Sequence, residues 1–142
     1  MRKALAGIAV LCLFSLVHVA PAPADDTAAV SAATKAADAW LKLIDSDDYA
    51  QSWTQASDFF QQHIPEQAWA MQVSAARDPL GELVSRKFAS AKYTTSLPGA
   101  PDGQYVVIQY NSSFAHKKSA VETVTPMRNA DGSWHVTGYY IR

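Results

Sequence analysis

The chain has 142 residues and a formal net charge of −1, and 49% of its residues are hydrophobic. This length suits one domain with one core, and the apolar content excludes a disordered chain. The charge excludes the strongly basic surface of a nucleic-acid-binding protein, so we expect no nucleic-acid partner.

The first 24 residues have the order of a secretory signal peptide. A positive start at Arg2 and Lys3 precedes a mostly apolar stretch over residues 4–19, and small residues follow at Ala22 and Ala24. The apolar stretch is shorter than the ~20 residues that a helix needs to cross a bilayer. We therefore predict cleavage after Ala24, export to the periplasm or the medium, and no stable membrane anchor after cleavage.

The remaining chain has no cysteine, because Cys12 is the only one in the sequence. Disulfide, thiolate and iron–sulfur chemistry are therefore excluded for the mature protein, which has to be held together by packing. Loss of Arg2 and Lys3 changes the net charge to −3. We divide the chain into a signal peptide (1–24), a flexible start of the mature chain (25–35) and a single domain (36–142).

Three helices are predicted in the first half of the mature chain, because apolar residues recur there at three- and four-residue steps. They are a helix over residues 30–44, a stripe over 49–56 with a short turn after it that carries Phe59 and Phe60, and a helix that begins at Pro65 and ends at Asp78-Pro79. Trp40, Trp53 and Trp69 lie on these stripes, so we expect them to face the core.

After Gly81 the pattern changes to β-branched and aromatic residues, which indicates strands. The expected strands are 82–97 with a bend near residues 89–91, then 105–110, 119–127 and 134–141. Helices followed by hairpin-connected strands predict an α+β domain, in which three N-terminal helices pack on a curved four-stranded antiparallel sheet. The cone between the two layers is a common place for a pocket.

Several runs of the sequence resemble one known family over about residues 36–142. The most specific are Pro-Gly-Ala-Pro-Asp-Gly at 98–103 and Val-Glu-Thr-Val-Thr at 121–125, and the others are Trp40 with Asp45, 49–53, 77–81 with Arg86, 105–110 and 134–140. They are similar to exported bacterial proteins grouped as domain of unknown function 4019. This resemblance implies export and assigns no activity. The order of elements is also similar to that of the nuclear-transport-factor-2-like (cystatin-like) cones, which implies an architecture and no function.

Two charged residues stand in strands that should be buried. Glu122 is the only acidic residue of the third predicted strand, and Arg86 lies in the first. In a catalytic interpretation, Glu122 is a general base and Arg86 holds an anionic ligand. A tyrosine then supplies a hydroxyl donor, with Tyr140 as the first candidate and Tyr105, Tyr110 and Tyr139 beside it. In the structural interpretation, which we favour, Arg86 and Glu122 form an ion pair or lie on a solvated face, because buried charges are costly unless paired.

No other pattern predicts a cofactor or metal site. The histidines at 63, 116 and 135 are widely spaced and lack acidic neighbours at ligand spacing, so we expect no metal. The loop at 99–103 has two glycines but also proline and no following helix, so it does not resemble a phosphate loop. Arg77 and Asp78 are interpreted as the end of a helix.

The sequence favours a non-catalytic module that binds a small molecule or a protein. One alternative is a small cofactor-independent lyase or isomerase with Glu122 as its base. That alternative needs the Glu122 carboxylate in a pocket, near a tyrosine hydroxyl and free of a saturating arginine. A second alternative is a homodimeric scaffold, in which one face of the apolar strand at 105–108 is covered by a partner chain.

Overall fold

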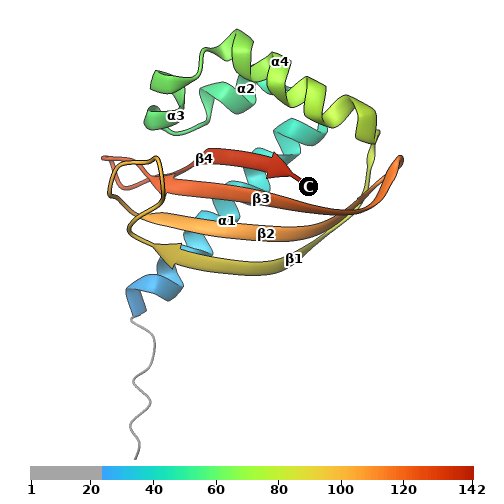
Figure 1. Ribbon diagram of the computed structural model, residues 1–142. Helices are drawn as coiled ribbons and strands as arrows, with labels where there is room; N and C mark the ends of the chain where they lie inside the picture. The colour runs from blue at the N-terminus through green and yellow to red at the C-terminus, as the bar shows by residue number, and fades with distance from the viewer. Residues whose placement is uncertain (1–23) are drawn as a thin grey trace, which may run out of the picture.

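The computed structural model describes residues 24–142, which fold into four α-helices, one 3₁₀ turn and four strands (Figure 1). In chain order they are α1 (Ala24–Asp45), α2 (Tyr49–Thr54), α3 (Asp58–His63), α4 (Glu66–Arg77), η1 (Asp78–Leu80), β1 (Leu83–Thr94), β2 (Tyr105–Phe114), β3 (Lys117–Arg128) and β4 (Trp134–Ile141). Residues 1–23, nearly all of the predicted signal peptide, lie outside the described residues. Among the described residues, no helix is both long and apolar enough to cross a membrane.

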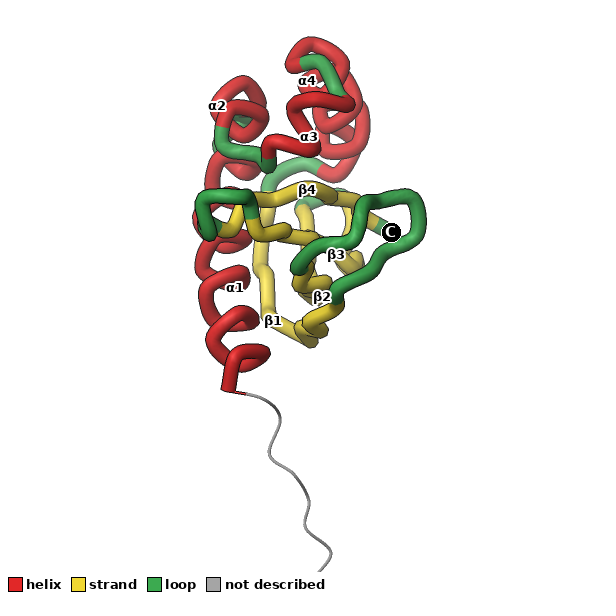
Figure 2. Tube along the Cα trace, turned by 90° about the vertical axis from the view of Figure 1, so that its left-hand side faces the viewer, coloured by secondary structure: helices red, strands yellow, loops and turns green. Residues whose placement is uncertain are grey.

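The predicted α+β class is confirmed. The four strands form one antiparallel sheet in the order β1-β2-β3-β4. α1 lies across one face of this sheet and contacts all four strands (Figure 2). The shorter helices α2, α3 and α4 lie beyond the β4 edge, where α2 packs on α4 and α3 contacts β4 (Figure 1). α1 is therefore the helix that covers the sheet, and α2–α4 close one end of the layer.

α1 begins earlier than its apolar stripe predicts. The segment expected to be flexible, residues 25–35, belongs to this helix, and Ala33 within it is fully buried. Alanine has the highest helix propensity of all residues, but its small side chain contributes little to an amphipathic pattern. The helix therefore begins before its apolar stripe, because the alanines that form this part of it carry a weak pattern.

Aromatic side chains pack α1 against the shorter helices. Trp40 and Trp69 are buried with ring centroids 5.8 Å apart, and Phe60 stands edge-on to Trp69 at 5.1 Å. Both indole N–H groups donate to Ser52, to its carbonyl oxygen from Trp40 and to its hydroxyl from Trp69. Trp53 is half-buried and donates to the carbonyl of Ile64. The three tryptophans thus contribute to packing, as their stripes predicted.

Register shifts interrupt the sheet at four places, and two of them bear on the sequence predictions and the site. One lies in β1 between Phe88 and Ser90, where the sequence predicted a bend. The other lies between Thr125 and Pro126 of β3, in its pairing with β4. Pro126 has no N–H to donate to a neighbouring strand, which favours a break in the ladder at this position. This second irregularity decides which side chains of β4 face the interior.

Candidate functional site

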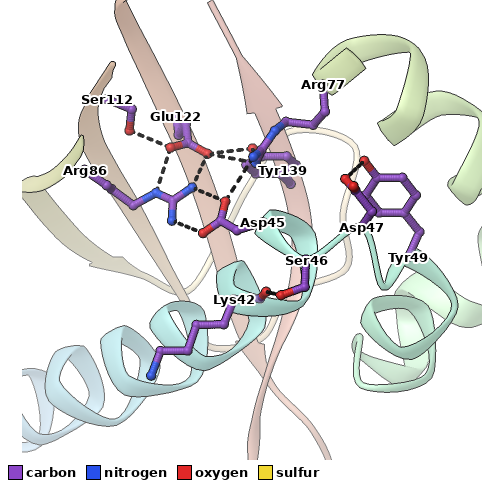
Figure 3. Close-up of polar contacts among 10 residues, drawn as sticks. All are labelled: Lys42, Asp45, Ser46, Asp47, Tyr49, Arg77, Arg86, Ser112, Glu122 and Tyr139. Atoms are coloured by element: carbon purple, nitrogen blue, oxygen red, sulfur yellow. Dashed lines mark hydrogen bonds and ion pairs between the residues drawn. The ribbon is translucent and has the colours of Figure 1, made fainter. Parts of the chain in front are cut away.

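Four charged side chains from four different elements meet beneath the end of α1 (Figure 3). Asp45 is the last residue of α1 and Arg77 the last of α4, while Arg86 lies on β1 and Glu122 on β3. Two hydroxyls, from Ser112 and Tyr139, complete the group. We call these six residues the ionic network.

Arg86 joins the two carboxylates of the ionic network. Its Nε and Nη2 donate to Oε1 and Oε2 of Glu122 at 2.7 and 3.0 Å. Its Nη1 and Nη2 donate to Oδ2 and Oδ1 of Asp45 at 2.7 and 3.0 Å. Both contacts are bidentate, which is the strongest geometry for an arginine and a carboxylate. One guanidinium thereby fixes the end of α1 against β1 and β3.

Arg77 approaches the same carboxylates from the other side. Its Nη2 donates to Oδ1 of Asp45 at 3.0 Å, and its Nη1 donates to the Tyr139 hydroxyl at 3.2 Å. The same Nη1 lies 3.9 Å from Oε2 of Glu122, and the guanidinium lies over the Phe114 ring at 4.9 Å from its centroid. α4 ends at this arginine because Pro79 follows two residues later. The end of α4 is thus held at the ionic network.

The Glu122 carboxylate has a full set of hydrogen-bond donors. Besides the two bonds from Arg86, Oε2 accepts from the Tyr139 hydroxyl at 2.6 Å, and Oε1 accepts from the Ser112 hydroxyl. A carboxylate offers about four lone-pair sites, and four donors occupy them here. The side chain of Glu122 has 0% exposure. This carboxylate therefore has neither a free lone pair nor contact with solvent.

The charges of the ionic network balance, with two guanidinium groups against two carboxylates. Burial by itself raises the pKa of Asp45, but hydrogen bonds and charge from Arg86 and Arg77 outweigh burial and lower that pKa below 3.8. Burial acts to lower the pKa of Arg86, and the two carboxylates outweigh it and raise that pKa. Burial and the nearby Glu122 carboxylate raise the pKa of Tyr139, so its hydroxyl stays protonated. The charges of Asp45 and Arg86 are therefore stabilised by their partners.

The structure brings Arg86 and Glu122 together and places Tyr140 elsewhere. Strict alternation along β4 from the buried Val136 would put Tyr140 on the inner face. The irregularity in the pairing of β3 with β4 shifts the alternation by one residue, so Tyr139 pairs with the buried Val124 and faces inward. Tyr140 is 55% exposed. The tyrosine at the ionic network is therefore Tyr139.

The hydroxyls of the other two candidate tyrosines bond to groups other than Glu122, although Tyr110 pairs with Glu122 across β2 and β3. Tyr110 donates to Oδ1 of Asp38 on α1 at 2.6 Å, and Tyr105 donates to the carbonyl of Pro101 at 2.5 Å. The second bond ties the loop before β2 to the outer face of the sheet.

Two of the three histidines contact backbone carbonyls. His63 contacts the carbonyl of Phe59 within α3, and His135 contacts the carbonyl of Gln55. In residues 24–142, no group of three or more His, Cys, Asp or Glu side chains is placed to hold a metal ion.

Asp45, Arg77 and Ser112 are the members of the ionic network that sequence reasoning did not select. Asp45 and Arg77 both end helices, and the sequence predicted this of Arg77. Their second role depends on the ends of α1 and α4 meeting in space, and 32 positions separate the two residues. A short-range pattern carries no signal for such a contact. Arg86 and Glu122 were found because they are charges inside apolar strands.

Open hollows lie on the outside of the domain. One of about 630 Å³ lies between the outer side of α1 and Phe88 of β1, with Lys35 and Lys42 among its lining residues. Another, of about 390 Å³, borders the ionic network at Asp45. The Asp45 side chain is 21% exposed, more than that of any other charged member of the ionic network.

These features define a small α+β domain whose internal charges serve to join its layers. Over residues 36–139 the sequence matches the family described as protein of unknown function DUF4019, and the chain belongs to that family. The match confirms the resemblance carried by the loop at 98–103 and the strand at 121–125. No curated protein matches the sequence.

Proposed function

We propose that this protein is an exported, non-catalytic module that binds a partner through its surface. The observation that carries the proposal is the closed state of Glu122, the one acidic residue buried inside the sheet. A general base needs a free lone pair within reach of a substrate proton. Glu122 has four hydrogen-bond donors and no exposed area. A structural role for the ionic network accounts for each of these contacts.

The lyase or isomerase alternative requires the ionic network to open. Arg86 would have to release Glu122 while it keeps Asp45, and a substrate would have to enter a space that Trp40 and Tyr139 fill at a ring separation of 5.4 Å. Breaking a buried ion pair costs on the order of 3–5 kcal/mol. The same contacts that disfavour catalysis favour a rigid scaffold, which presents a fixed surface to a partner.

The experiment that tests catalysis compares Glu122→Gln with Ser112→Ala, the milder change at the same carboxylate. The purified chain is incubated with a panel of small carbonyl, ester and hydroxy-acid compounds, and turnover is followed by NMR. The proposal predicts no turnover by the wild type. Turnover that the wild type shows and Glu122→Gln loses, in a variant whose spectrum is that of a folded protein, contradicts it.

Export is tested separately, by mass spectrometry of the chain made in a bacterial host. The proposal predicts a periplasmic product whose mass corresponds to residues 25–142. A product that stays in the cytoplasm with residues 1–24 attached contradicts export.

A further inference from the structure

β1 is a free edge of the sheet, whereas the opposite edge is covered. At β4, the carbonyl of Val136 accepts from the backbone N–H of Ser57, and α3 contacts the strand. β1 pairs with β2 on one side, and no strand within residues 24–142 pairs with its other side. Figure 1 shows β1 at the side of the sheet opposite to α2–α4. The unpaired backbone groups of such an edge can pair with another strand.

Two of the large exposed apolar side chains lie on this edge strand. Val84 is 64% exposed and Phe88 55% exposed. Phe88 faces the α1 side of the sheet, where its ring stands edge-on to Tyr110 at 6.2 Å. It forms one wall of the hollow of about 630 Å³ beside α1. A strand that pairs with the backbone of β1 would therefore lie next to an apolar surface.

Four exposed lysines surround this edge, and we call them the lysine frame: Lys35, Lys42, Lys87 and Lys92. The first two line the hollow with Phe88. Lys87 and Lys92 pair with Asn111 and Val107, which share the opposite face of β2. Asp38 also lines the hollow, and its carboxylate accepts from the Tyr110 hydroxyl, so the α1 side carries two lysines against one carboxylate. Both sides of the free edge therefore carry exposed lysines, in a chain whose net charge is negative.

From this geometry we infer that β1 binds an extended, acidic polypeptide segment as a fifth strand. The inference rests on the proposed function and names the class of its partner. Main-chain hydrogen bonds to β1 supply affinity, as in other cases of strand addition. Alternate side chains of the segment meet either the hollow, with Phe88, Lys35 and Lys42, or the outer face, with Lys87 and Lys92. Acidic residues on both sides, with an apolar residue opposite Phe88, match these two surfaces.

A second copy of the chain fits this edge poorly. Antiparallel pairing of β1 with itself would bring Lys87 and Lys92 of two chains to one ladder, and like charges in such pairs are destabilising. Edge lysines also protect sheets from unwanted pairing. The charge that repels a second β1 attracts an acidic strand.

The probe is a ten-residue fluorescent peptide that repeats Asp-Asp-Val-Val, so that each face of the extended strand presents both aspartates and valines. Binding to the full domain is measured by anisotropy at low salt and mapped by amide NMR shifts. We expect shifts in β1 and in the part of α1 that lines the hollow, and weaker binding at higher salt because the charges are exposed. The double variant Lys87→Glu/Lys92→Glu should weaken binding at least tenfold, and Phe88→Ser at least threefold. Lys118→Glu, an exposed charge at the start of β3, is the matched control and should change binding less than twofold.

Two further peptides separate strand addition from simple charge attraction. A peptide with lysine in place of aspartate should not bind, and one with central prolines should lose binding because proline lacks the N–H for the ladder. The inference is overturned if the acidic peptide does not bind, if Lys118→Glu weakens binding as much as the β1 variant, or if the proline peptide binds equally well. It is also overturned if light scattering shows a dimer that Lys87→Glu/Lys92→Glu alters. None of these results contradicts the proposed function. Only turnover that depends on Glu122, or failure of export, would contradict it.

Discussion

Substitution of Arg86 by methionine tests whether the ionic network holds the domain together. The change removes four charge-assisted hydrogen bonds, two to each carboxylate. Asp45 keeps its bond to Arg77 and is partly exposed, so most of the cost falls on the fully buried Glu122. Loss of one partner of a buried ion pair costs about 3–5 kcal/mol. This is a large share of the ~5–15 kcal/mol that stabilises a typical domain.

A double-mutant cycle separates the ion pair from other effects of the substitutions. Glu122→Gln alone leaves two arginines against one carboxylate and should also cost about 3–5 kcal/mol. The double variant removes one charge of each sign and leaves Asp45 paired with Arg77. Its cost should therefore be smaller than the sum of the single costs by about 1–3 kcal/mol.

The assay is urea unfolding at pH 7, followed by tryptophan fluorescence. Trp40 reports on the site, because its ring lies 5.4 Å from that of Tyr139. Lys87→Met, an exposed neighbour on β1, is the control and should change the free energy of unfolding by less than about 0.5 kcal/mol. Single costs below about 1 kcal/mol, or costs that add without coupling, would refute the reasoning.

Three further predictions concern stability at low pH, the inward-facing Tyr139 and the turn residue Gly81. The folded-state pKa of Asp45 is lowered, so its stabilising contribution is present above the unfolded value of 3.8 and is lost as the pH falls through the folded value. Asp45→Asn should therefore lower the free energy of unfolding at pH 7, and the difference from wild type should shrink below pH 3.8 in urea titrations; a constant difference contradicts this linkage. Tyr139→Phe leaves a buried charge short of a donor and should cost about 1–3 kcal/mol, while Tyr140→Phe at the exposed neighbour should cost less than about 0.5 kcal/mol in the same assay. Gly81 has φ 71° and ψ −165°, where a side chain is strained. A Cβ added there would lie 2.7 Å from Cδ2 of His116, in the turn between β2 and β3. Gly81→Ala should therefore lower the thermal midpoint more than Gly99→Ala, whose φ of 78° is also positive but whose Cβ meets no atom within 4 Å; equal losses would show that the contact has no effect.

Much of the fold could be predicted because its signals are local. The change from helical spacing to β-branched runs at Gly81 separates the two halves, and β4 has the predicted bounds of residues 134–141. The start of α1 was missed because its alanines carry propensity without a clear stripe. The end of β2 was also predicted too early, since Asn111, Ser112 and Ser113 extend the strand without apolar side chains.

Only part of the ionic network could be predicted from the sequence, and the reason is different. A charge in an apolar strand must find a partner, which selected Arg86 and Glu122. The choice of Tyr139 over Tyr140 depends on the irregularity between Thr125 and Pro126, and alternation along a single strand cannot show a one-residue shift in pairing. Asp45 joins the group only through the tertiary fold.

The exchange of the Arg86 Nε proton with solvent tests the closed ionic network most directly. It can be followed by side-chain NMR at neutral pH, with the exposed Arg142 as the internal reference. The account predicts that the Nε–H of Arg86, which donates to Glu122 at 2.7 Å, exchanges at least a hundredfold more slowly than that of Arg142. Exchange of the two protons at similar rates would contradict the account, because the carboxylate would then be open to water and to substrates.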